Sequence, residues 1–457
     1  MVVNHNMTEY LDTPIDYGEE EINHFIPKSA NAQYLEIDGD FPELVDIESK
    51  LIGVLENPID SPPLKEIVSK NYIKGKPVII LVDDNTRPNI HTRILLPYLF
   101  MKIIDYGVTP EDLKILVASG THRPPTDEEV ERKILGSKIW QNYKDHILVH
   151  NCDEGVTKIG TSSRGTPIFL NNDAYAACII IALTDSEYHY FAGVAGTVKQ
   201  FFPGIAGRET ISKNHPKAFS LETGFLPECR LGNTKGNPVI QDMKEMVEEV
   251  MKTKPVFCID AILHSKKIVK LNAGNIISLH ELALDILKPL RIIEVDKGGD
   301  LVIITTGDLG LNLYQAGKGV HAAWNAATKG GKILLLAKAQ DGVGNKAYHE
   351  TMITVKDMTL EKALTWVVEN KCSEETFRIG NQKPVDLLRI LMDNQFDMIS
   401  EMDPKELKET FKINPIKIKG SVEETVKKYV KDFLAEKPDG LIYVMADAGI
   451  YIKPKEK

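Results

Sequence analysis

The length and charge of this chain exclude several classes of protein. Its 457 residues exceed the roughly 250–300 residues over which one hydrophobic core usually extends, so we expect two domains. A composition of 43% hydrophobic and 26% charged residues is ordinary for a globular protein, whereas a net charge of −10 argues against a nucleic-acid-binding protein, which needs a basic face.

Residues 1–40 are polar and weakly patterned, which predicts a peripheral segment. Beyond them, short apolar runs alternate with amphipathic stretches of helical period, a pattern typical of α/β units with a largely parallel sheet. Strands are predicted at residues 77–82, 113–118, 147–150, 177–183, 301–305 and 333–337. Their continuous apolar character indicates strands that are buried on both faces.

Helix starts can be recognised between these runs. Thr126, with Glu129 three residues later, predicts a capping box. Asn237-Pro238 predicts a cap and a first-turn proline ahead of a helix over residues 241–251.

An apolar helix over residues 282–287 marks the predicted domain boundary. We expect an N-terminal α/β domain over residues 1–290 and a C-terminal α/β domain over 291–437, with residues 438–457 as a candidate to rejoin the first. The predicted fold class is α/β, with two domains of mainly parallel sheet and the active site in the cleft between them.

Three polar motifs begin within a few residues of predicted strands. They are Asp-Asn-Thr-Arg-Pro at 84–88, Gly-Thr-His-Arg-Pro at 120–124, and the segment 188–199. Because ligands bind at the carboxyl ends of strands in open α/β sheets, we expect these loops to converge. A fourth motif, Tyr-Gln-Ala-Gly-Lys-Gly at 314–319, follows the strand predicted at 301–305 and belongs to the second domain.

The run from residue 189 to residue 215 concentrates reactive side chains. His189 and His215 supply imidazoles that can titrate near neutral pH or bind a metal, and Lys199 supplies an amine between them. Four glycines predict close passage of the backbone past something bulky: Gly193, Gly196, Gly204 and Gly207. From the residues alone, a glycine-bearing turn with a solvated lysine and incidental histidines is an equal alternative.

Taken in order, the four motifs resemble those of the nickel-pincer nucleotide enzymes of the lactate racemase family. The intervals of ten residues from His189 to Lys199, and of sixteen from Lys199 to His215, also match that family. The resemblance extends over about residues 75–345 and is weak at both ends of the chain.

The resemblance implies a cofactor and a mechanism. Lys199 would carry a nickel-pincer nucleotide, a pyridinium mononucleotide with two sulfur ligands, and His215 would complete the coordination of Ni(II). His122 and His189 would be the paired acid/base residues for hydride transfer at C2 of a 2-hydroxy acid. The other implied site residues are Asp84, Asn85, Thr86 and Arg87 for the cofactor, Arg87, Gln315 and Lys318 for catalysis, and Tyr314, Gln315 and Lys318 for the substrate pocket.

The chain departs from the family pattern at Thr197-Val198, at Gln200 and in the stretch 380–384. In the last, Asn381 and Gln382 stand where lactate racemase has a tryptophan, so we predict a polar pocket wall. Because an unpaired buried amide costs about 1–3 kcal/mol, an aldonate or malate is expected to be a better substrate than lactate. Racemisation of lactate itself stays open as the alternative.

Two interpretations of other kinds compete with this one. A conventional nicotinamide-dependent 2-hydroxy acid dehydrogenase needs G-x-G-x-x-G between a strand and a helix, a spacing that Gly193 and Gly196 do not satisfy. A non-catalytic carrier of the nickel nucleotide is expected to lose either His122 or His189, and both are present.

The expected partners are a small 2-hydroxy acid and the enzymes that build the cofactor, without nucleic acid or membrane, and a homo-oligomer is left open. No apolar stretch approaches the ~18 residues of a membrane span, and the first residues lack the layout of a signal peptide. The five cysteines are scattered and never spaced C-x-x-C, which fits reduced thiols and excludes a zinc ribbon. We therefore expect a cytoplasmic protein.

Overall fold

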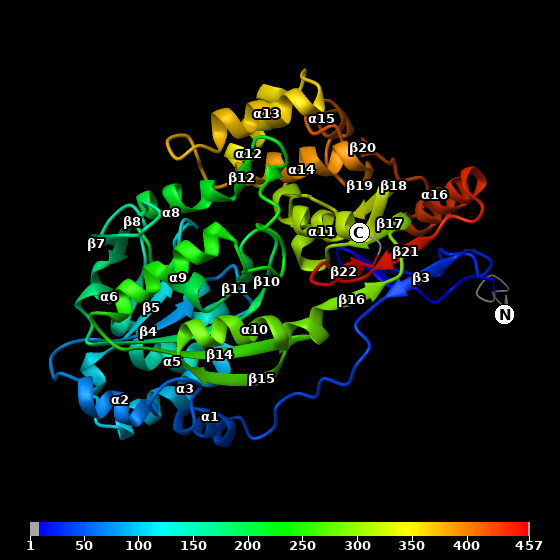
Figure 1. Ribbon diagram of the computed structural model, residues 1–457. Helices are drawn as coiled ribbons and strands as arrows, with labels where there is room; N and C mark the ends of the chain where they lie inside the picture. Colours follow the sequence, from blue (N-terminus) through cyan, green and yellow to red (C-terminus); the bar gives the residue numbers. More distant parts are fainter. Residues whose placement is uncertain (1–8, 456–457) are drawn as a thin grey trace. The chain divides into compact units, whose positions relative to one another are not determined.

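The computed structural model of the chain describes residues 9–455 and divides into two compact units (Figure 1). The larger unit holds residues 39–218 and 226–288. The smaller unit holds residues 9–38, 219–225 and 289–455. Each unit is built around its own six-stranded sheet.

The sheet of the larger unit has the strand order β15-β14-β9-β4-β5-β6. Its strands are β4 (Val78–Asp83), β5 (Leu113–Ala118), β6 (Ile147–Val149), β9 (Ile179–Asp185), β14 (Val256–His264) and β15 (Lys267–Gly274). All neighbours are parallel except β15, which pairs antiparallel with β14. The four strands predicted here are confirmed with small shifts at their ends. The β14–β15 hairpin was not predicted.

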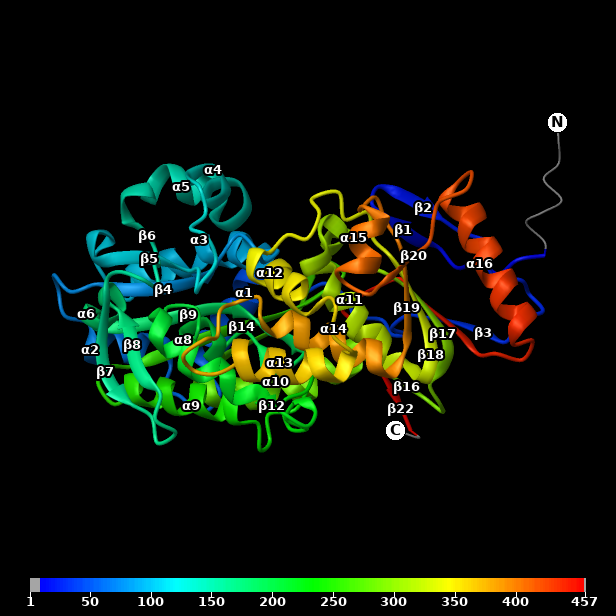
Figure 2. The same cartoon turned by 90° about the horizontal axis from the view of Figure 1, so that it is seen from above.

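Helices cover both faces of this sheet. Alternate residues of β4, Val78, Ile80 and Val82, lie in one core cluster with α1, α2 and α3, and Figures 1 and 2 show α9 and α10 on the opposite side. The longer helices are α1 (Ile47–Glu56), α2 (Leu64–Asn71), α3 (Ile90–Asp105), α9 (Pro238–Met251) and α10 (Ile276–Arg291). The short ones are α4 (Asp127–Glu129), α5 (Ser137–Tyr143), α6 (Asn172–Ala176), α7 (Val198–Phe201) and α8 (Arg208–Asn214).

Both predicted helix starts are confirmed. Thr126 and Glu129 form the reciprocal capping box of α4, which continues as a π-helical segment, Val130–Leu135. The Asn237 side chain accepts from two backbone N–H groups at the start of α9, with Pro238 in its first turn. Two antiparallel hairpins complete the unit: β7 (Val156–Thr161) with β8 (Pro167–Asn171), and β10 (Glu187–His189) with β11 (Gly193–Ala195).

The sheet of the smaller unit is parallel throughout, in the order β20-β19-β18-β17-β21-β3. Its strands are β3 (Ala32–Leu35), β17 (Gly299–Thr305), β18 (Ala327–Leu336), β19 (Gln395–Ile399), β20 (Asn414–Pro415) and β21 (Ile442–Met445). The hairpin of β1 (Ile15–Tyr17) and β2 (Glu20–Ile22) packs with α16 (Val422–Glu436) on one face, and α11 (Leu313–Ala326) and α14 (Gln382–Asp393) lie against the other (Figure 2).

Further elements of this unit are α12 (Lys346–Val355), α13 (Leu360–Lys371), α15 (Pro404–Glu409), the parallel pair β16 (Ile292–Val295) and β22 (Tyr451–Pro454), and the hairpin of β12 (Phe219–Ser220) and β13 (Gly224–Phe225).

Both ends of the described chain belong to the smaller unit, which differs from the predicted division at residue 290. Strand β3 pairs with β21, and β21 pairs with β17, so residues 9–38 and the C-terminal strands complete this sheet. Ile15 and Ile22 are buried in its core. These strands are only three or four residues long, too short for their alternation to stand out in the sequence. The first eight residues of the predicted peripheral segment lie outside the described part.

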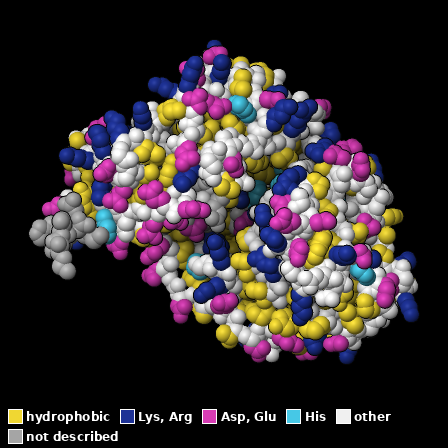
Figure 3. Space-filling model, turned by 180° about the vertical axis from the view of Figure 1, so that it is seen from behind, with side chains coloured by type: hydrophobic (Ala, Val, Ile, Leu, Met, Phe, Trp, Pro, Cys, Tyr) yellow, Lys and Arg dark blue, Asp and Glu magenta, His cyan; other side chains and the backbone are white. Residues whose placement is uncertain are grey.

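Within residues 9–455, no helix combines the length and apolar character that a membrane span requires. On the face drawn in Figure 3, lysine and arginine side chains are interspersed with aspartate and glutamate.

Candidate active site

The three motifs of the larger unit follow the adjacent strands β9, β4 and β5 at their carboxyl ends. The backbone N–H of Gly120 donates to the carbonyl of Gly204, at 2.9 Å, and joins the second loop to the turn that follows α7, just beyond the third motif. Arg87 forms an ion pair with Glu187, which joins the first loop to the third. The structure therefore brings these distant segments together, as the strand order requires.

Asp84 organises the first loop and orients His122. Its buried carboxylate accepts from Oγ1 of Thr86 at 2.6 Å and from the backbone N–H of the same residue at 3.1 Å. The other oxygen lies 2.6 Å from Nδ1 of His122. Burial alone would raise the pKa of Asp84, but hydrogen bonds from His122 and Thr86 outweigh it and lower the pKa. The ionised carboxylate accepts a hydrogen bond from the Nδ1–H group. The neutral ring of His122 therefore has its free lone pair on Nε2.

His189 has the opposite hydrogen-bonding arrangement. It ends β10, and its Nδ1 accepts from the backbone N–H groups of Phe191, at 3.4 Å, and Ala192, at 3.2 Å. An accepting Nδ1 places the proton of the neutral ring on Nε2. His122 and His189 thus present different forms of Nε2, one a proton acceptor and the other a proton donor.

Phe191 contacts all three reactive side chains of the 189–215 run. Its ring centroid lies 4.6 Å from that of His189 and 5.6 Å from that of His215, both edge-on. Nζ of Lys199 is 5.8 Å from the same centroid. The two imidazoles and the amine are therefore gathered around one buried aromatic ring.

Burial favours the uncharged forms of Lys199 and His215, in which each nitrogen has a free electron pair to donate. Burial, followed by the positive charge of Arg87, lowers the pKa of Lys199 to about 7, although Glu187 acts in the opposite direction. Burial and the nearby Lys199 lower the pKa of His215 to about 3. The neutral imidazole is the form that binds a metal. The uncharged amine, which a lowered pKa makes available, is the form that bonds to an acyl carbon.

Arg87 lies among several carboxyl groups. Glu187 is the main reason that its pKa is raised above the usual range, with contributions from Asp185, Asp83 and Asp84. Burial and the neighbouring Asp185 raise the pKa of Asp83 well above its usual range. The raised pKa of Asp83 favours its protonated form, which limits the negative charge beside Arg87.

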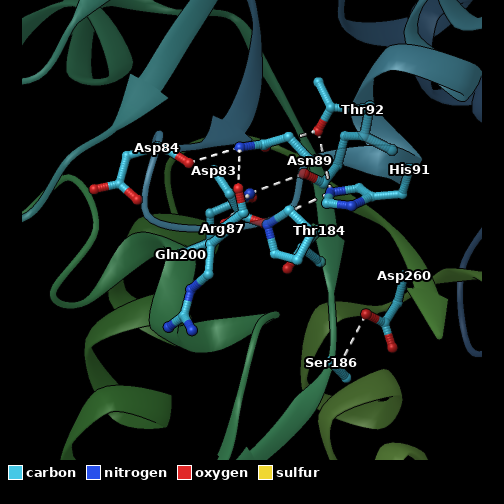
Figure 4. A network of polar contacts seen from close by, with 12 residues as sticks. Asp83, Asp84, Arg87, Asn89, His91, Thr92, Thr184, Ser186, Gln200 and Asp260 are labelled. Carbon is cyan, nitrogen blue, oxygen red and sulfur yellow. Dashed lines mark hydrogen bonds and ion pairs between the residues drawn. The ribbon is translucent and has the colours of Figure 1, made fainter. Parts of the chain in front are cut away.

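Asp83, Asp185 and the buried His91 place their side-chain ligand atoms within 4.8 Å of one another. Gln200 donates to Asp83 at 3.1 Å and to the carbonyl of Leu183 at 2.8 Å, as part of the network in Figure 4.

Asn85, in the first motif, donates to Glu129 at 3.0 Å, at the start of α4. The first motif therefore bonds chiefly to its own unit, through Asp84, Asn85 and Thr86.

Two glycines of the run, Gly193 and Gly196, lie close to the backbone of other segments of the chain. A Cβ on Gly193 would lie 2.4 Å from the carbonyl oxygen of Asn233, and one on Gly196 would lie 2.4 Å from that of Asp185. Both residues also have a left-handed backbone, with φ of +83° and +76°. These two glycines therefore allow the chain to pass close to its own backbone.

The fourth motif lies in the smaller unit, on α11. Gln315 and Lys318 are exposed and three residues apart, which places them on one side of the helix. The hydroxyl of Tyr314 accepts from Nε2 of Gln382 at 3.2 Å.

The expected polar wall of Asn381 and Gln382 does not have unpaired amides. Asn381 donates to the carbonyl of Lys371 at 2.9 Å and accepts from Thr351 at 3.3 Å. Gln382 accepts from the backbone N–H of Gly380 at 2.8 Å as well as donating to Tyr314. The argument that an apolar substrate would strand these groups is therefore wrong, because partners within the smaller unit already satisfy them.

Comparison with known proteins identifies the family. Sequence models of the lactate racemase N-terminal and C-terminal domains match residues 17–224 and 295–450. The curated lactate racemase of Lactiplantibacillus plantarum is 34% identical over 308 residues, which are 66% of this chain and 69% of that protein. The chain belongs to the lactate racemase family. It is therefore an isomerase, and the family predicted from the four motifs is confirmed.

A second curated relative and two solved structures are also similar to this chain. The curated lactate racemase of Thermoanaerobacterium thermosaccharolyticum is 28% identical over 411 residues, which are 88% of this chain and 89% of that protein. The structure of a lactate racemase apoprotein from that organism gives a TM-score of 0.81 at 24% identity, covering 97% of this chain and 100% of the other. A crystal structure from Thermotoga maritima gives 0.66 at 17% identity, covering 92% and 100%. At these identities the structures support the α/β fold alone.

In this lactate racemase-family chain, sequence reasoning missed residues that shape the site, notably Glu187 and Phe191. Glu187 stands two residues before His189 in β10, so both side chains project from the same face of the strand. That spacing could have indicated Glu187. Phe191 had no signal of its own, because an aromatic residue inside a glycine-rich run is compatible with any packed turn.

Proposed function

We propose that this chain interconverts the two configurations at C2 of a small 2-hydroxy acid, with a nickel-pincer nucleotide held by Lys199 and His215. The observation that carries the proposal is the cluster around Phe191, where two imidazoles and an amine of lowered pKa meet one ring. Packing alone does not require these groups. The curated relatives named as lactate racemases support the same reaction class.

The residues present fit that cofactor. A lysine with a pKa of about 7 is largely uncharged at slightly alkaline pH, as an amine that forms an amide or thioamide must be. A histidine with a pKa of about 3 stays neutral and offers a lone pair to Ni(II), which accepts imidazole nitrogen well. When bound, the cofactor supplies an acceptor for the hydride of C2 and can return it to either face of the carbon.

The two histidines move the hydroxyl proton. With Nδ1 bonded to Asp84, Nε2 of His122 accepts the proton from the substrate hydroxyl, and Asp84 stabilises the imidazolium that forms. His189 donates a hydrogen bond from Nε2 to the carbonyl oxygen, and its imidazolium form returns the proton to that oxygen as the opposite configuration is formed. In the reverse direction the two residues exchange roles.

Arg87 is the proposed partner of the substrate carboxylate. Its guanidinium can form two parallel hydrogen bonds to a carboxylate, and it keeps its charge at every working pH. Gln315 and Lys318 stay predictions from the resemblance to the family, with Tyr314 as a pocket residue.

Lactate is the substrate that we propose to test first. The preference for an aldonate or malate depended on unpaired amides at Asn381 and Gln382, and both amides have partners. These two residues therefore give no reason to expect a free-energy cost for binding the methyl group of lactate.

The test uses chain produced together with the cofactor-building enzymes. Single-enantiomer lactate, malate and aldonates are incubated with it and analysed by chiral chromatography. Conversion from either enantiomer toward an equal mixture, without added nicotinamide dinucleotide, supports the proposal. Nickel-loaded protein that leaves every 2-hydroxy acid unchanged contradicts it, and turnover that requires NAD favours the dehydrogenase.

A further inference from the structure

Thr197, two residues before Lys199, has a backbone conformation that a threonine rarely adopts. It precedes α7 with φ of 42° and ψ of −113°. Positive φ is unfavourable for every residue with a Cβ and most of all for a β-branched one. Surrounding contacts must therefore hold Thr197 in place.

Three elements supply those contacts. The backbone N–H of Thr197 donates to Oγ1 of Thr184, in β9, at 3.1 Å. Its carbonyl accepts from the N–H of Gln200, in α7, at 3.0 Å. Its hydroxyl lies 2.7 Å from Nδ1 of His280, in α10. The Thr184, Thr197 and His280 side chains are all fully buried, so water cannot replace any of these bonds.

His280 is suited to a permanent contact. Burial, followed by the charges of Lys244 and Lys199, lowers its pKa to about 3, so the ring stays neutral at any pH at which the protein works.

The turn held in this way determines where Lys199 points. The N–H of Lys199 donates to the carbonyl of Gly196 at 2.9 Å, across Thr197, and Nζ reaches the Phe191 ring. If Thr197 relaxed to an ordinary negative φ, the direction of the chain entering α7 would change, and Lys199 would move with it.

We infer that His280 is a positioning residue for Lys199, which acts by clamping the Thr197 hydroxyl and so maintaining the strained turn. The importance of His280 for catalysis rests on the proposed role of Lys199. The hydrogen bond between His280 and Thr197, in contrast, is present in the folded chain without cofactor. The experiment therefore measures the apparent pKa of the Lys199 amine directly.

The measurement is competitive acetylation of the purified chain, produced without the cofactor-building enzymes, over a range of pH. Mass spectrometry of the Lys199 peptide gives the apparent pKa of its amine, which should be about 7 in the unaltered chain. In His280→Leu and in Thr197→Val, Lys199 should leave its buried position, and this pKa should rise by ~1 unit or more. His280→Asn, whose amide can occupy the position of Nδ1, should restore the lower value.

A second arm separates positioning from general destabilisation. Thr197→Gly removes the strain together with the hydroxyl, so adding His280→Leu to it should leave the Lys199 pKa unchanged. An equal rise in both backgrounds would overturn the inference. His146→Leu is the matched control, because His146 lies in the same unit but contacts Leu113 and Tyr143.

Folding of each variant is checked by thermal unfolding. If His280→Leu does not fold, Thr197→Val removes the same hydrogen bond and replaces it in the test. A folded His280→Leu or Thr197→Val chain in which Lys199 keeps its low pKa overturns the inference. If the variants show the predicted shifts but the unaltered chain racemises nothing after cofactor loading, the proposed function is contradicted and the positioning role stands.

Discussion

Nδ1 of His122 lies 2.6 Å from a carboxylate oxygen of Asp84, and the two residues come from loops that follow neighbouring strands. Asp84 is almost fully buried, whereas half of the His122 side chain is exposed. The buried partner therefore fixes the ring, and the exposed edge of the ring can meet a substrate. The arrangement gives His122 one defined tautomer without enclosing it.

Asp84→Asn should reduce both activity and stability near neutral pH. In the folded state the pKa of Asp84 is lowered, so its stabilising contribution is complete above the pKa of the unfolded chain and is lost as the pH falls through the folded-state pKa. The variant should lose stability at pH 7 and approach the unaltered chain as the pH falls below the lowered pKa of Asp84. Interconversion should fall by on the order of 100-fold, because a neutral amide stabilises the His122 imidazolium poorly.

Urea unfolding at several pH values and steady-state rates test this pair of effects. Thr86→Val is the informative control, since it removes one hydrogen bond to Asp84 and leaves the carboxylate with His122. A difference in stability between Asp84→Asn and the unaltered chain that does not change with pH would contradict the assignment.

Lys199 should carry a nucleotide-sized, sulfur-containing adduct in active protein. The amine is buried beside Phe191 and has a pKa near 7, so it is the uncharged nucleophile of the loop. Peptide mapping by mass spectrometry locates the adduct. Lys199→Arg keeps a long basic side chain but cannot form the bond, and it should lose adduct, nickel and activity together. Unmodified Lys199 in demonstrably active protein would refute the assignment.

His215→Ala should release nickel while the Lys199 adduct remains. The buried, neutral imidazole is the proposed protein ligand of the metal, whereas the covalent attachment does not depend on it. Nickel analysis and intact mass measured on the same sample distinguish the two. His349→Ala, which alters a histidine paired with Glu406 in the smaller unit, should retain both. If nickel and activity survive His215→Ala, His189 is the next candidate to examine.

His122→Gln and His189→Gln should each cripple interconversion in both directions, by roughly 10²–10⁴-fold, because a full turnover uses one as base and the other as acid. C2-deuterated substrate tests the route in the unaltered chain. Hydride transfer returns the label mostly to C2, whereas removal of a proton from carbon exchanges it with water. Early, complete loss of label to solvent is the result that excludes hydride transfer.

Gly196→Ala should destabilise the larger unit more than Gly155→Ala does. Both glycines have positive φ, +76° and +64°, which costs an alanine roughly 1–2 kcal/mol. A Cβ at Gly196 also meets the carbonyl of Asp185 at 2.4 Å, whereas nothing lies within 4 Å of one at Gly155. Denaturant unfolding of the two variants isolates the cost of the clash. Equal losses would show that the Gly196 loop can shift without penalty.

The sequence by itself determined the fold class, four strands of the larger sheet, the strands β17 and β18 of the smaller sheet, and the order of the chemical motifs. Apolar runs such as that of β4 are long enough to be recognised, and the carboxyl ends of parallel strands must meet at one edge. Short strands such as β3 carry no such signal. Their place in the sheet was decided by pairing with β21, more than four hundred residues away in the chain.

Only the tertiary structure decided the finer features of the site. Whether an amide is unpaired depends on its neighbours in space, which is why the amides of Asn381 and Gln382 were wrongly taken to be unpaired. The tautomers of His122 and His189 follow from Asp84 and from the backbone of Phe191 and Ala192. Residue types and spacing name the reactive groups, but burial and hydrogen-bond partners set their charge and direction, and both arise only when the chain is packed.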